Sequence, residues 1–339
     1  MQQEITKASP LLADDGRLSQ VGWARQPLLD CNLEQSRVYR LRPLQRLRIK
    51  RWDYYGVTFP GGYFSATIAH LGYAGQIFIY LVDFAAATFR EATITIPLGR
   101  GVELARNSDQ GTSSYRGKKA KLEFATDGDT RAVHVDWSGF GGERLVADLY
   151  YQQPPESTVV AIPIGERRFY YNRKINCMPV KGALTVGNTA YPIEPDTSSG
   201  NLDWGRGVWD YDSFWVWASA SGFLDDGRRI GLNMGYGFGD TSAATENTVL
   251  LDGRTHKLEG VDFAYDDRNF MRPWRMRSDR VDLEFTPFLD RFAHTNLLII
   301  RSGVHQMFGR YAGTVVIDGG EELRIRDLVG WAEEHHARW

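Results

Sequence analysis

Short runs of β-branched and aromatic residues, separated by tight-turn signals, recur along nearly the whole chain. Clear examples are Tyr63–Ala69, Gln76–Phe84 and Ala92–Leu98, which lie between Gly and Pro residues. Asp-Gly and Gly-Gly pairs between the runs supply the positive φ angles that hairpin turns require. This pattern predicts an all-β protein built as a sandwich or a barrel. The clearest helical pattern is at the tail, where we expect a short C-terminal helix over Ile325–Arg338.

The length of the chain favours two structural units. At 339 residues it exceeds the usual size of one domain. The tripeptide Trp52–Tyr54 recurs as Trp209–Tyr211, and this weak repeat favours two related β units. Pro154–Ser157 is rich in turn-forming residues and marks the expected boundary. We therefore expect an N-terminal half over residues 1–155 and a C-terminal half, which carries the candidate site, over residues 156–339.

The charge balance and the apolar runs exclude several classes of protein. The net charge is −2, from 40 basic and 42 acidic residues, which argues against a nucleic-acid partner that needs a basic field. The basic stretch Arg40–Arg51 alternates like a strand, and we expect a solvated strand face there. The N-terminus lacks the layout of a signal peptide, and no apolar run approaches the ~20 residues of a membrane span. We expect a cytoplasmic protein with no transmembrane segment.

Cysteines, histidines and glycines show no cofactor-binding spacing. Cys31 and Cys177 form no CxxC motif, so we expect two free thiols in a reducing compartment. The seven histidines are scattered, without HExxH or HxH spacing. The chain contains no GxGxxG fingerprint, P-loop or GxSxG elbow. The sequence therefore predicts no metal and no cofactor, and leaves a small molecule as the expected partner.

The stretch 201–217 holds the densest mixture of indole rings and charges in the chain. If Phe214–Ser219 is a strand, Trp215 and Trp217 point to the same face. A carboxylate among indole rings is poorly solvated, which favours its protonated form, so Asp203 is the candidate general acid. The alternative is that Asp203 pairs with Arg206 and only fastens a loop.

A second carboxylate and further polar residues complete the candidate site. Glu246 is the candidate partner of Asp203, because paired carboxylates suit glycoside hydrolysis or proton shuttling. The alternative is that Glu246 is an ordinary surface residue. The rings, in turn, either line a ligand groove or fill a large β core. The candidate ligand-binding residues are Trp52, Tyr54, Trp204, Arg206, Trp209, Trp215, Trp217, Asn233 and Asn247.

Several segments together resemble an uncharacterised bacterial family, domain of unknown function 2804. More distantly, the family is similar to the group of carotenoid hydratases, tocopherol cyclases and lipocalin-like cyclases. This resemblance implies two lipocalin-like β units, as barrel or sandwich halves packed side by side, and apolar, isoprenoid-like substrates. The segments that carry it are Leu11–Leu28, Arg48–Tyr73, Asp203–Gly222, Thr245–Gly253 and Gln306–Trp339.

The acid motif of the distant group is altered in this chain. The group carries an acid a few residues before an aromatic-Gly pair, which here is Trp204-Gly205. The position four before the glycine is Asn201, which is not an acid. Asp203 lies two residues further on and would share a strand face with Asn201. The resemblance therefore implies the fold more directly than the chemistry.

Three functions stay open on the sequence alone. The first is an enzyme that acts on a lipophilic or isoprenoid-like small molecule, with Asp203 as the general acid. The second is a non-catalytic carrier of an apolar ligand. The third is a carbohydrate-active protein in which Asp203 and Glu246 form the acid pair. A closed aromatic cavity near Asp203 would favour the first two, and a long polar cleft would favour the third.

Overall fold

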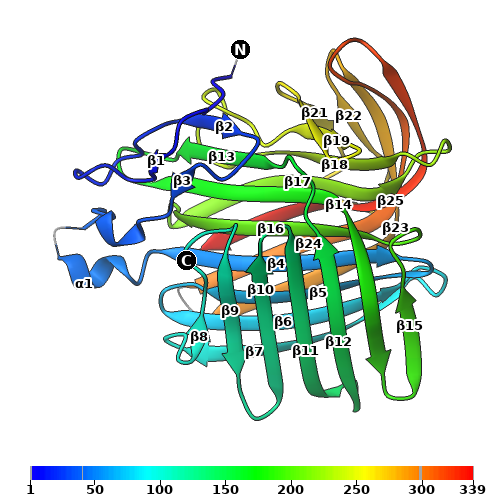
Figure 1. The fold of residues 1–339 in the computed structure, drawn as a ribbon, viewed down its shortest axis with the longest axis horizontal. Coiled ribbons are helices and arrows are strands. Elements are labelled where there is room, and N and C mark those ends of the chain that lie inside the picture. The colour runs from blue at the N-terminus through cyan, green and yellow to red at the C-terminus, as the bar shows by residue number, and fades with distance from the viewer. Residues whose placement is uncertain (1, 40, 298–299, 339) are drawn as a thin grey trace.

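Two large curled β-sheets form most of the protein and pack against each other (Figure 1). The structure, a computed structural model, describes residues 2–39, 41–297 and 300–338. Within these residues every strand pairing is antiparallel except that of β1 (Ser9–Pro10) with β3 (Leu29–Asp30). The helices are the 3-10 turn η1 (Leu33–Gln35) and the short α1 (Arg42–Gln45). The predicted all-β class is therefore confirmed.

The first sheet, as described, contains fourteen strands and ends at Val208. Its main path runs in the order β7, β6, β5, β4, β16, β14, β12, β11, β10, β9, β8, while β13 and β15 pair with β14, and β2 pairs with β13. Its strands are β2 (Gly22–Ala24), β4 (Lys50–Phe59), β5 (Gly62–His70), β6 (Ala74–Asp83), β7 (Thr88–Pro97), β8 (Val102–Glu103), β9 (Gly111–Arg116), β10 (Ala120–Asp127), β11 (Thr130–Phe140), β12 (Glu143–Gln152), β13 (Thr158–Pro163), β14 (Phe169–Val186), β15 (Thr189–Ile193) and β16 (Ser199–Val208).

The second sheet, as described, contains nine strands and begins at Asp212. Its order is β20, β19, β18, β17, β25, β24, β23, β22, β21, so that β17 and the C-terminal strand lie side by side at its centre. Its strands are β17 (Asp212–Phe223), β18 (Arg229–Tyr236), β19 (Thr248–Leu251), β20 (Arg254–Lys257), β21 (Asp262–Ala264), β22 (Trp274–Arg277), β23 (Val281–Leu297), β24 (Ile300–Val316) and β25 (Glu322–Arg338).

The predicted C-terminal helix is wrong, because residues Glu322–Arg338 form strand β25 between β17 and β24. The buried side chains Leu323 and Ile325 are two residues apart, as in a strand, but the next, Leu328, is three further on. A β-bulge at this point, where Asp327 has φ 55°, inserts the extra residue. Buried residues that are first two and then three positions apart resemble the spacing of apolar residues in an amphipathic helix.

Strand β14 bends the first sheet and links it to the second. Its first part pairs with β13 and β16, and its last part pairs with β12 and β15. The register shifts between Ile175 and Met178, where Cys177 has φ 51°. The bulge directs Asn176 toward the second sheet, where its Nδ2 donates to Ser219 Oγ at 2.9 Å. The bend thus curls the first sheet and fastens it to β17.

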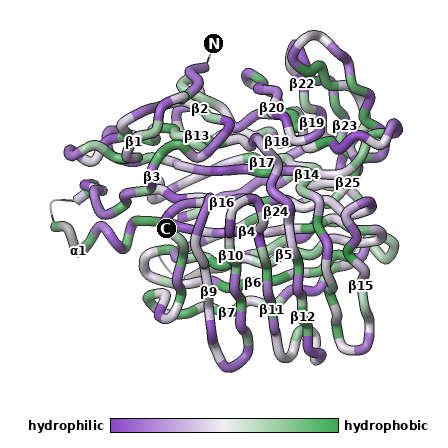
Figure 2. The backbone as a smooth tube through the Cα atoms, in the orientation of Figure 1, coloured by the Kyte–Doolittle hydropathy of each residue, from purple (hydrophilic) through white to green (hydrophobic). Residues whose placement is uncertain are grey.

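Three clusters of buried side chains follow from the curled sheets. The first, which includes Val57 and Trp204, lies inside the first sheet, and the second, which includes Val216 and Phe285, lies inside the second. Along β12, buried and exposed residues alternate in the way that a one-sided sheet requires, and Figure 2 shows the matching alternation of hydropathy along such strands. The third cluster, here called the interface layer, lies between the two sheets and contains Trp23, Tyr54, Tyr63, Tyr80, Val82, Val160, Ile162, Tyr170, Trp209, Trp217, Phe238, Ala244, Phe308 and Trp331.

The structure can be compared with four further predictions, on the domain boundary, the basic stretch, the cysteines and membrane-spanning segments. The boundary expected at Pro154–Ser157 lies between β12 and β13, which both belong to the first sheet, so a division of the chain there stays a prediction. Of the basic stretch Arg40–Arg51, Arg40 lies outside the described residues. Most of the remainder is not a strand, because α1 and turns precede β4, which begins at Lys50. Cys31 and Cys177 are both buried free thiols, as predicted. No helix among the described residues is long and apolar enough to cross a membrane.

Candidate functional site

A cavity of about 250 Å³ lies in the interface layer, with walls from both sheets. Strands β4 to β7, β14 and β16 supply one wall, and β17 and β23 to β25 supply the other. This volume is slightly below the usual range of small-molecule pockets, so the cavity suits a small ligand. The aromatic side chains that line it are Trp52, Tyr54, Phe78, Tyr80, Tyr170, Trp209, Trp215, Trp217 and Phe238.

A row of three cross-strand neighbours places Asp203 in this cavity. In the register of the first sheet, Asp203 on β16 lies opposite Lys174 on β14 and opposite Tyr54 on β4. The Lys174 ammonium is 2.9 Å from Asp203 Oδ2, and Asn172 Nδ2 donates to Asp203 Oδ1 at 2.6 Å. The ammonium also lies 3.7 Å from the centre of the Trp217 ring, in a cation–π contact. Asp203 is thus a carboxyl group that an ion pair and a hydrogen bond hold in a fixed position.

Glu246 meets the same lysine from the loop between β18 and β19. Its Oε1 is 3.9 Å from Lys174 Nζ, and Tyr170 donates its hydroxyl to Glu246 Oε2 at 3.2 Å. Burial raises the pKa of Glu246, and the nearby Lys174 opposes this effect. The two carboxylates predicted as a pair therefore converge on one ammonium group. Glu246 itself lies behind the cavity wall, because it is not among the residues that line the cavity.

Glu333 on β25 is a third carboxylate, and it lines the cavity directly. Trp215 Nε1 donates to its Oε1 at 3.2 Å, and Gln306 Nε2 donates to its Oε2 at 3.1 Å. Burial raises the pKa of Glu333 to about 7, although the Trp215 hydrogen bond and the Lys174 charge act in the opposite direction. Both neighbours are donors and cannot accept the proton of a neutral Glu333. That proton is therefore available to a molecule in the cavity.

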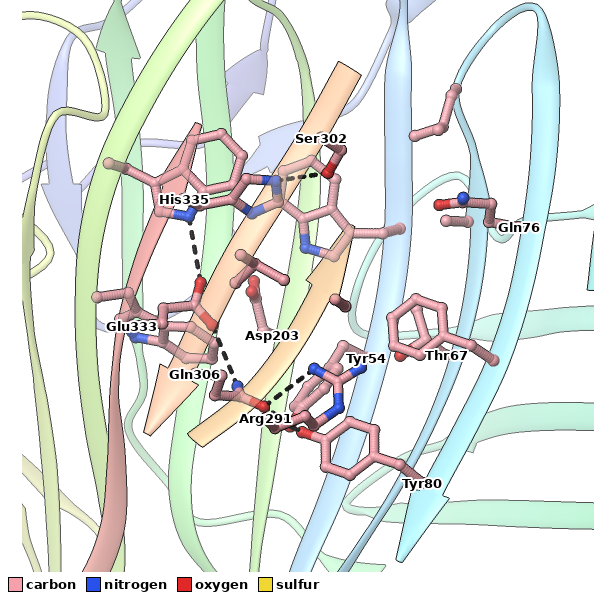
Figure 3. Close-up of a pocket in the computed structure, with 18 of the residues that line it drawn as sticks. Tyr54, Thr67, Gln76, Tyr80, Asp203, Arg291, Ser302, Gln306, Glu333 and His335 are labelled. Carbon is pink, nitrogen blue, oxygen red and sulfur yellow. Dashed lines mark hydrogen bonds between the residues drawn. The ribbon is translucent and has the colours of Figure 1, made fainter. Parts of the chain in front are cut away.

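A hydrogen-bonded chain continues from Glu333 into the polar end of the cavity (Figure 3). Gln306 Oε1 accepts from Arg291 Nη1 at 3.3 Å and from the Tyr80 hydroxyl at 2.9 Å. The Arg291 guanidinium lies 4.0 Å from the centre of the Tyr80 ring and pairs with Glu91. These contacts fix a buried positive charge near a carboxyl group whose pKa is raised.

Two buried polar atoms at this end lack partners. Arg291 Nε and Thr67 Oγ1 form no hydrogen bond with any described residue, although both side chains line the cavity. A buried donor or hydroxyl without a partner carries a free-energy cost, which a hydrogen bond to a further group would remove. This end of the cavity can therefore bind the polar group of an otherwise apolar molecule.

His335 lies two residues beyond Glu333 on the same face of β25 and also lines the cavity. Its Nε2 is 2.8 Å from Ser302 Oγ. Burial lowers the pKa of His335 to about 3, with smaller effects from the charges of His336 and Arg291. The imidazole is therefore neutral at physiological pH and adds a hydrogen-bonding group without a charge.

The predicted residues divide into three groups, which face the first core, line the cavity or lie behind its wall. Two of them face the first core: the Arg206 guanidinium lies 4.1 Å from the centre of the Trp204 ring and forms an ion pair with Asp53 at 2.8 Å. Asp203 and Arg206 are three residues apart on one strand, so they point to opposite faces and do not pair. The predicted residues that line the cavity are Trp52, Tyr54, Asp203, Trp209, Trp215 and Trp217.

The two predicted asparagines hold the wall from behind. Asn233 accepts from Trp217 Nε1 at 2.8 Å and donates to the Glu246 carbonyl at 2.8 Å. Asn247 accepts from the Gly235 amide at 2.7 Å and donates to the Glu259 carbonyl at 2.9 Å. Neither lines the cavity. They fix the Trp217 ring and the segment that carries Glu246, and their role as ligand-binding residues stays a prediction.

Sequence reasoning missed the cavity residues on β14 and β24 to β25. Tyr170, Asn172 and Lys174 lie on one face of β14, but the sequence there has three aromatic residues followed by three polar ones, which is not a period-2 signal. Glu333 and His335 share a face of β25, but the expected helix hid this alternation. Asn201 shares the face of Asp203, as expected, and accepts from the Tyr63 hydroxyl at 3.1 Å. Among the described residues, no three His, Cys, Asp or Glu side chains are grouped as metal ligands.

A family model described as "Domain of unknown function (DUF2804)" matches residues 2–339. The chain belongs to this family. The family predicted from the sequence segments is therefore confirmed. No curated protein matches the sequence.

Solved structures share this fold at low sequence identity. An AttH-like protein from Nitrosomonas europaea is 15% identical, with a TM-score of 0.51 over 86% of this chain and 93% of that protein. CghA is 13% identical, with a TM-score of 0.52 over 86% of this chain and 88% of CghA. Kievitone hydratase from Nectria haematococca is 10% identical, with a TM-score of 0.45 over 98% of both chains. At such identities the first two structures show the fold, which is the lipocalin-like arrangement that the resemblance implied.

Proposed function

We propose that this DUF2804 protein is an enzyme that moves protons on a lipophilic small molecule bound between the two sheets. The observation that carries the proposal is Glu333, a carboxyl group in an aromatic cavity whose pKa is raised to about 7 by burial. A general acid is most effective when its pKa lies near the working pH. Asp203, ion-paired with Lys174, supplies a carboxylate in the same cavity.

The two carboxyl groups suit opposite roles. Glu333 gives its proton to one carbon of a substrate double bond, which leaves a positive charge on the neighbouring carbon and a carboxylate on Glu333. The Trp215 and Trp217 rings lower the energy of that cation by cation–π attraction. Asp203 then accepts a proton from a carbon adjacent to the cation, and the double bond re-forms in a new position. Exchange with solvent returns one proton to Glu333 and removes one from Asp203, so the net reaction is an isomerisation.

The role predicted for Asp203 from the sequence was that of the general acid. While Asp203 is in its salt bridge with Lys174 it carries no proton to donate, and this supports assigning the donor role to Glu333 and the acceptor role to Asp203. The polar end of the cavity supports the choice of substrate. Arg291 Nε and Thr67 Oγ1 suit a carbonyl or hydroxyl oxygen on an otherwise apolar chain.

The carbohydrate-active alternative has less support. Glycosidases need two carboxyl groups on either side of the scissile bond. Asp203 and Glu246 instead share one lysine, and Glu246 lies outside the cavity lining.

Solvent-deuterium incorporation tests the proposal. The protein is incubated in D₂O with farnesol, geranylgeraniol and retinol, each in detergent, and the recovered alcohols are analysed by mass spectrometry. We expect deuterium in at least one probe with wild type, a loss of at least about 100-fold in Glu333→Gln and in Asp203→Asn, and no change in Glu322→Gln, an exposed control on the same strand.

Ligand binding is measured separately, so that catalysis and carriage are distinguished. Several of the cavity-lining residues are tryptophans, and bound retinol accepts their excitation energy. Energy transfer in wild type and in Glu333→Gln, with no deuterium incorporated by either, would establish a carrier and refute the enzyme. Incorporation that survives in Glu333→Gln would refute the assignment of the proton donor.

A further inference from the structure

The segment that precedes β4 is both strongly basic and unusually apolar at its surface. Residues 37–48 contain five arginines and no Asp or Glu. The same segment exposes Tyr39 by 42%, Leu41 by 65%, Leu44 by 45% and Leu47 by 40%. We call residues 37–48 the basic apolar segment. The function proposed above gives this segment no role.

Exposed apolar side chains elsewhere are isolated by comparison. Among the described residues outside this segment, the large apolar side chains that are exposed each lie on a different strand or loop, and they are Leu98, Tyr150, Tyr211, Met271 and Phe292. Single exposed apolar residues are normal on a soluble protein, whereas a cluster marks an interaction site. The clustering within one short segment therefore requires a partner.

The basic apolar segment packs against residues that border the cavity. Arg48 Nη2 donates to the Trp209 carbonyl at 2.9 Å. On its other side, a Cβ placed on Gly72 would lie 2.5 Å from the Leu47 carbonyl oxygen, so the β5–β6 turn fits closely against the segment. Trp209 and Leu71, the neighbour of Gly72, both line the cavity. The segment is thus attached to the cavity wall.

We propose that the basic apolar segment docks on the surface of an anionic lipid bilayer. Leucine and tyrosine side chains insert between lipid headgroups, and arginines bind the lipid phosphates. Charge complementarity selects this partner, because every charged residue of the segment is an arginine while the chain as a whole carries a net charge of −2. An anionic bilayer attracts the basic apolar segment and repels the rest of the protein, which is net acidic. The protein is thereby oriented with the cavity wall beside the segment toward the membrane.

Vesicle flotation tests the docking. Wild-type protein is mixed at low salt with vesicles of phosphatidylcholine alone, or with vesicles that contain about one-third phosphatidylglycerol. We expect at least about tenfold stronger partitioning to the anionic vesicles and its loss at high salt, because surface electrostatics is screened. The double variant Leu41→Ser/Leu44→Ser and the single variant Arg46→Gln should each reduce partitioning about tenfold.

Matched controls keep the result independent of folding and of catalysis. Leu98→Ser and Tyr150→Ser remove equally exposed apolar side chains elsewhere and should bind vesicles as wild type does. Glu333→Gln should also bind normally, so a failure of the proposed enzyme does not affect this test. The proposal is overturned if wild type ignores anionic vesicles, if neutral vesicles bind it equally well, or if the control variants lose as much binding as the segment variants. Circular dichroism confirms that each variant is folded.

Discussion

Replacement of Glu333 by glutamine should make the protein relatively more stable as the pH rises. In the folded state burial raises the pKa of Glu333 to about 7, whereas an unfolded glutamate titrates near its ordinary value of 4.5. The folded state therefore keeps a proton that the unfolded state releases. The stability associated with Glu333 is fully present below pH 4.5 and is lost as the pH rises through 7.

The size of the effect follows from the two pKa values. Each unit of difference corresponds to about 1.4 kcal/mol, so the full shift amounts to about 3 kcal/mol in the free energy of unfolding. Glu333 is buried, and solvent screening therefore reduces this figure little. Glutamine is neutral at every pH and nearly the same size, so the variant lacks this dependence.

Urea denaturation between pH 4 and pH 8 measures the difference. At pH 4 the free energies of unfolding of wild type and Glu333→Gln should differ by a constant that reflects the altered hydrogen bonds to Trp215 and Gln306. At pH 8 the variant should have gained about 3 kcal/mol relative to wild type. Glu322→Gln, exposed on the same strand, serves as the control and should follow wild type. A difference that stays flat from pH 4 to pH 8, or that changes in the opposite direction, would refute a raised pKa at Glu333.

Three further substitutions probe the same region. Lys174→Met leaves two buried carboxylates without their shared ammonium and should lower the free energy of unfolding by about 3–5 kcal/mol in urea denaturation, while Lys181→Met, exposed on the same strand, should change it little. Gly205→Ala places a Cβ 2.2 Å from the Trp52 indole and should cost about 1–3 kcal/mol and weaken energy transfer to retinol; unchanged values of both would contradict the close approach. Because burial lowers the pKa of His335 to about 3, wild type should lose about 3 kcal/mol relative to His335→Gln as the pH falls from 7 to 4, and a parallel pH profile of the two proteins would argue against a buried neutral imidazole.

The fold class was predictable because strand signals are local. Period-2 alternation and Gly-containing turns depend on residues close in sequence, as in the run Gln76–Phe84 that became β6. The prediction of a C-terminal helix was wrong for an equally local reason. The bulge at Asp327 changes the spacing of buried residues from that of a strand to one that resembles a helix. A bulge inserts a single residue and leaves no reliable mark in the sequence.

The candidate site was predictable in part, because half of it lies in one stretch. Asp203, Trp209, Trp215 and Trp217 all line the cavity and all come from the aromatic stretch that the sequence singles out. Their partners come from β14 and from the second sheet, and the pairing register that brings them together is a long-range property. Lys174 therefore could not be assigned to Asp203 from the sequence spacing.

The position of the cavity between the sheets affects how a protein of this fold can diversify. None of the side chains that line the cavity belongs to the first or the second hydrophobic cluster. Substitutions that reshape the cavity therefore remove no contact from either core, and effects at separate sites are nearly additive. Evolution or laboratory selection can therefore change which ligand binds by changing the residues between the sheets. The hydrophobic cores of the two sheets stay intact and keep the protein stable enough to tolerate the change.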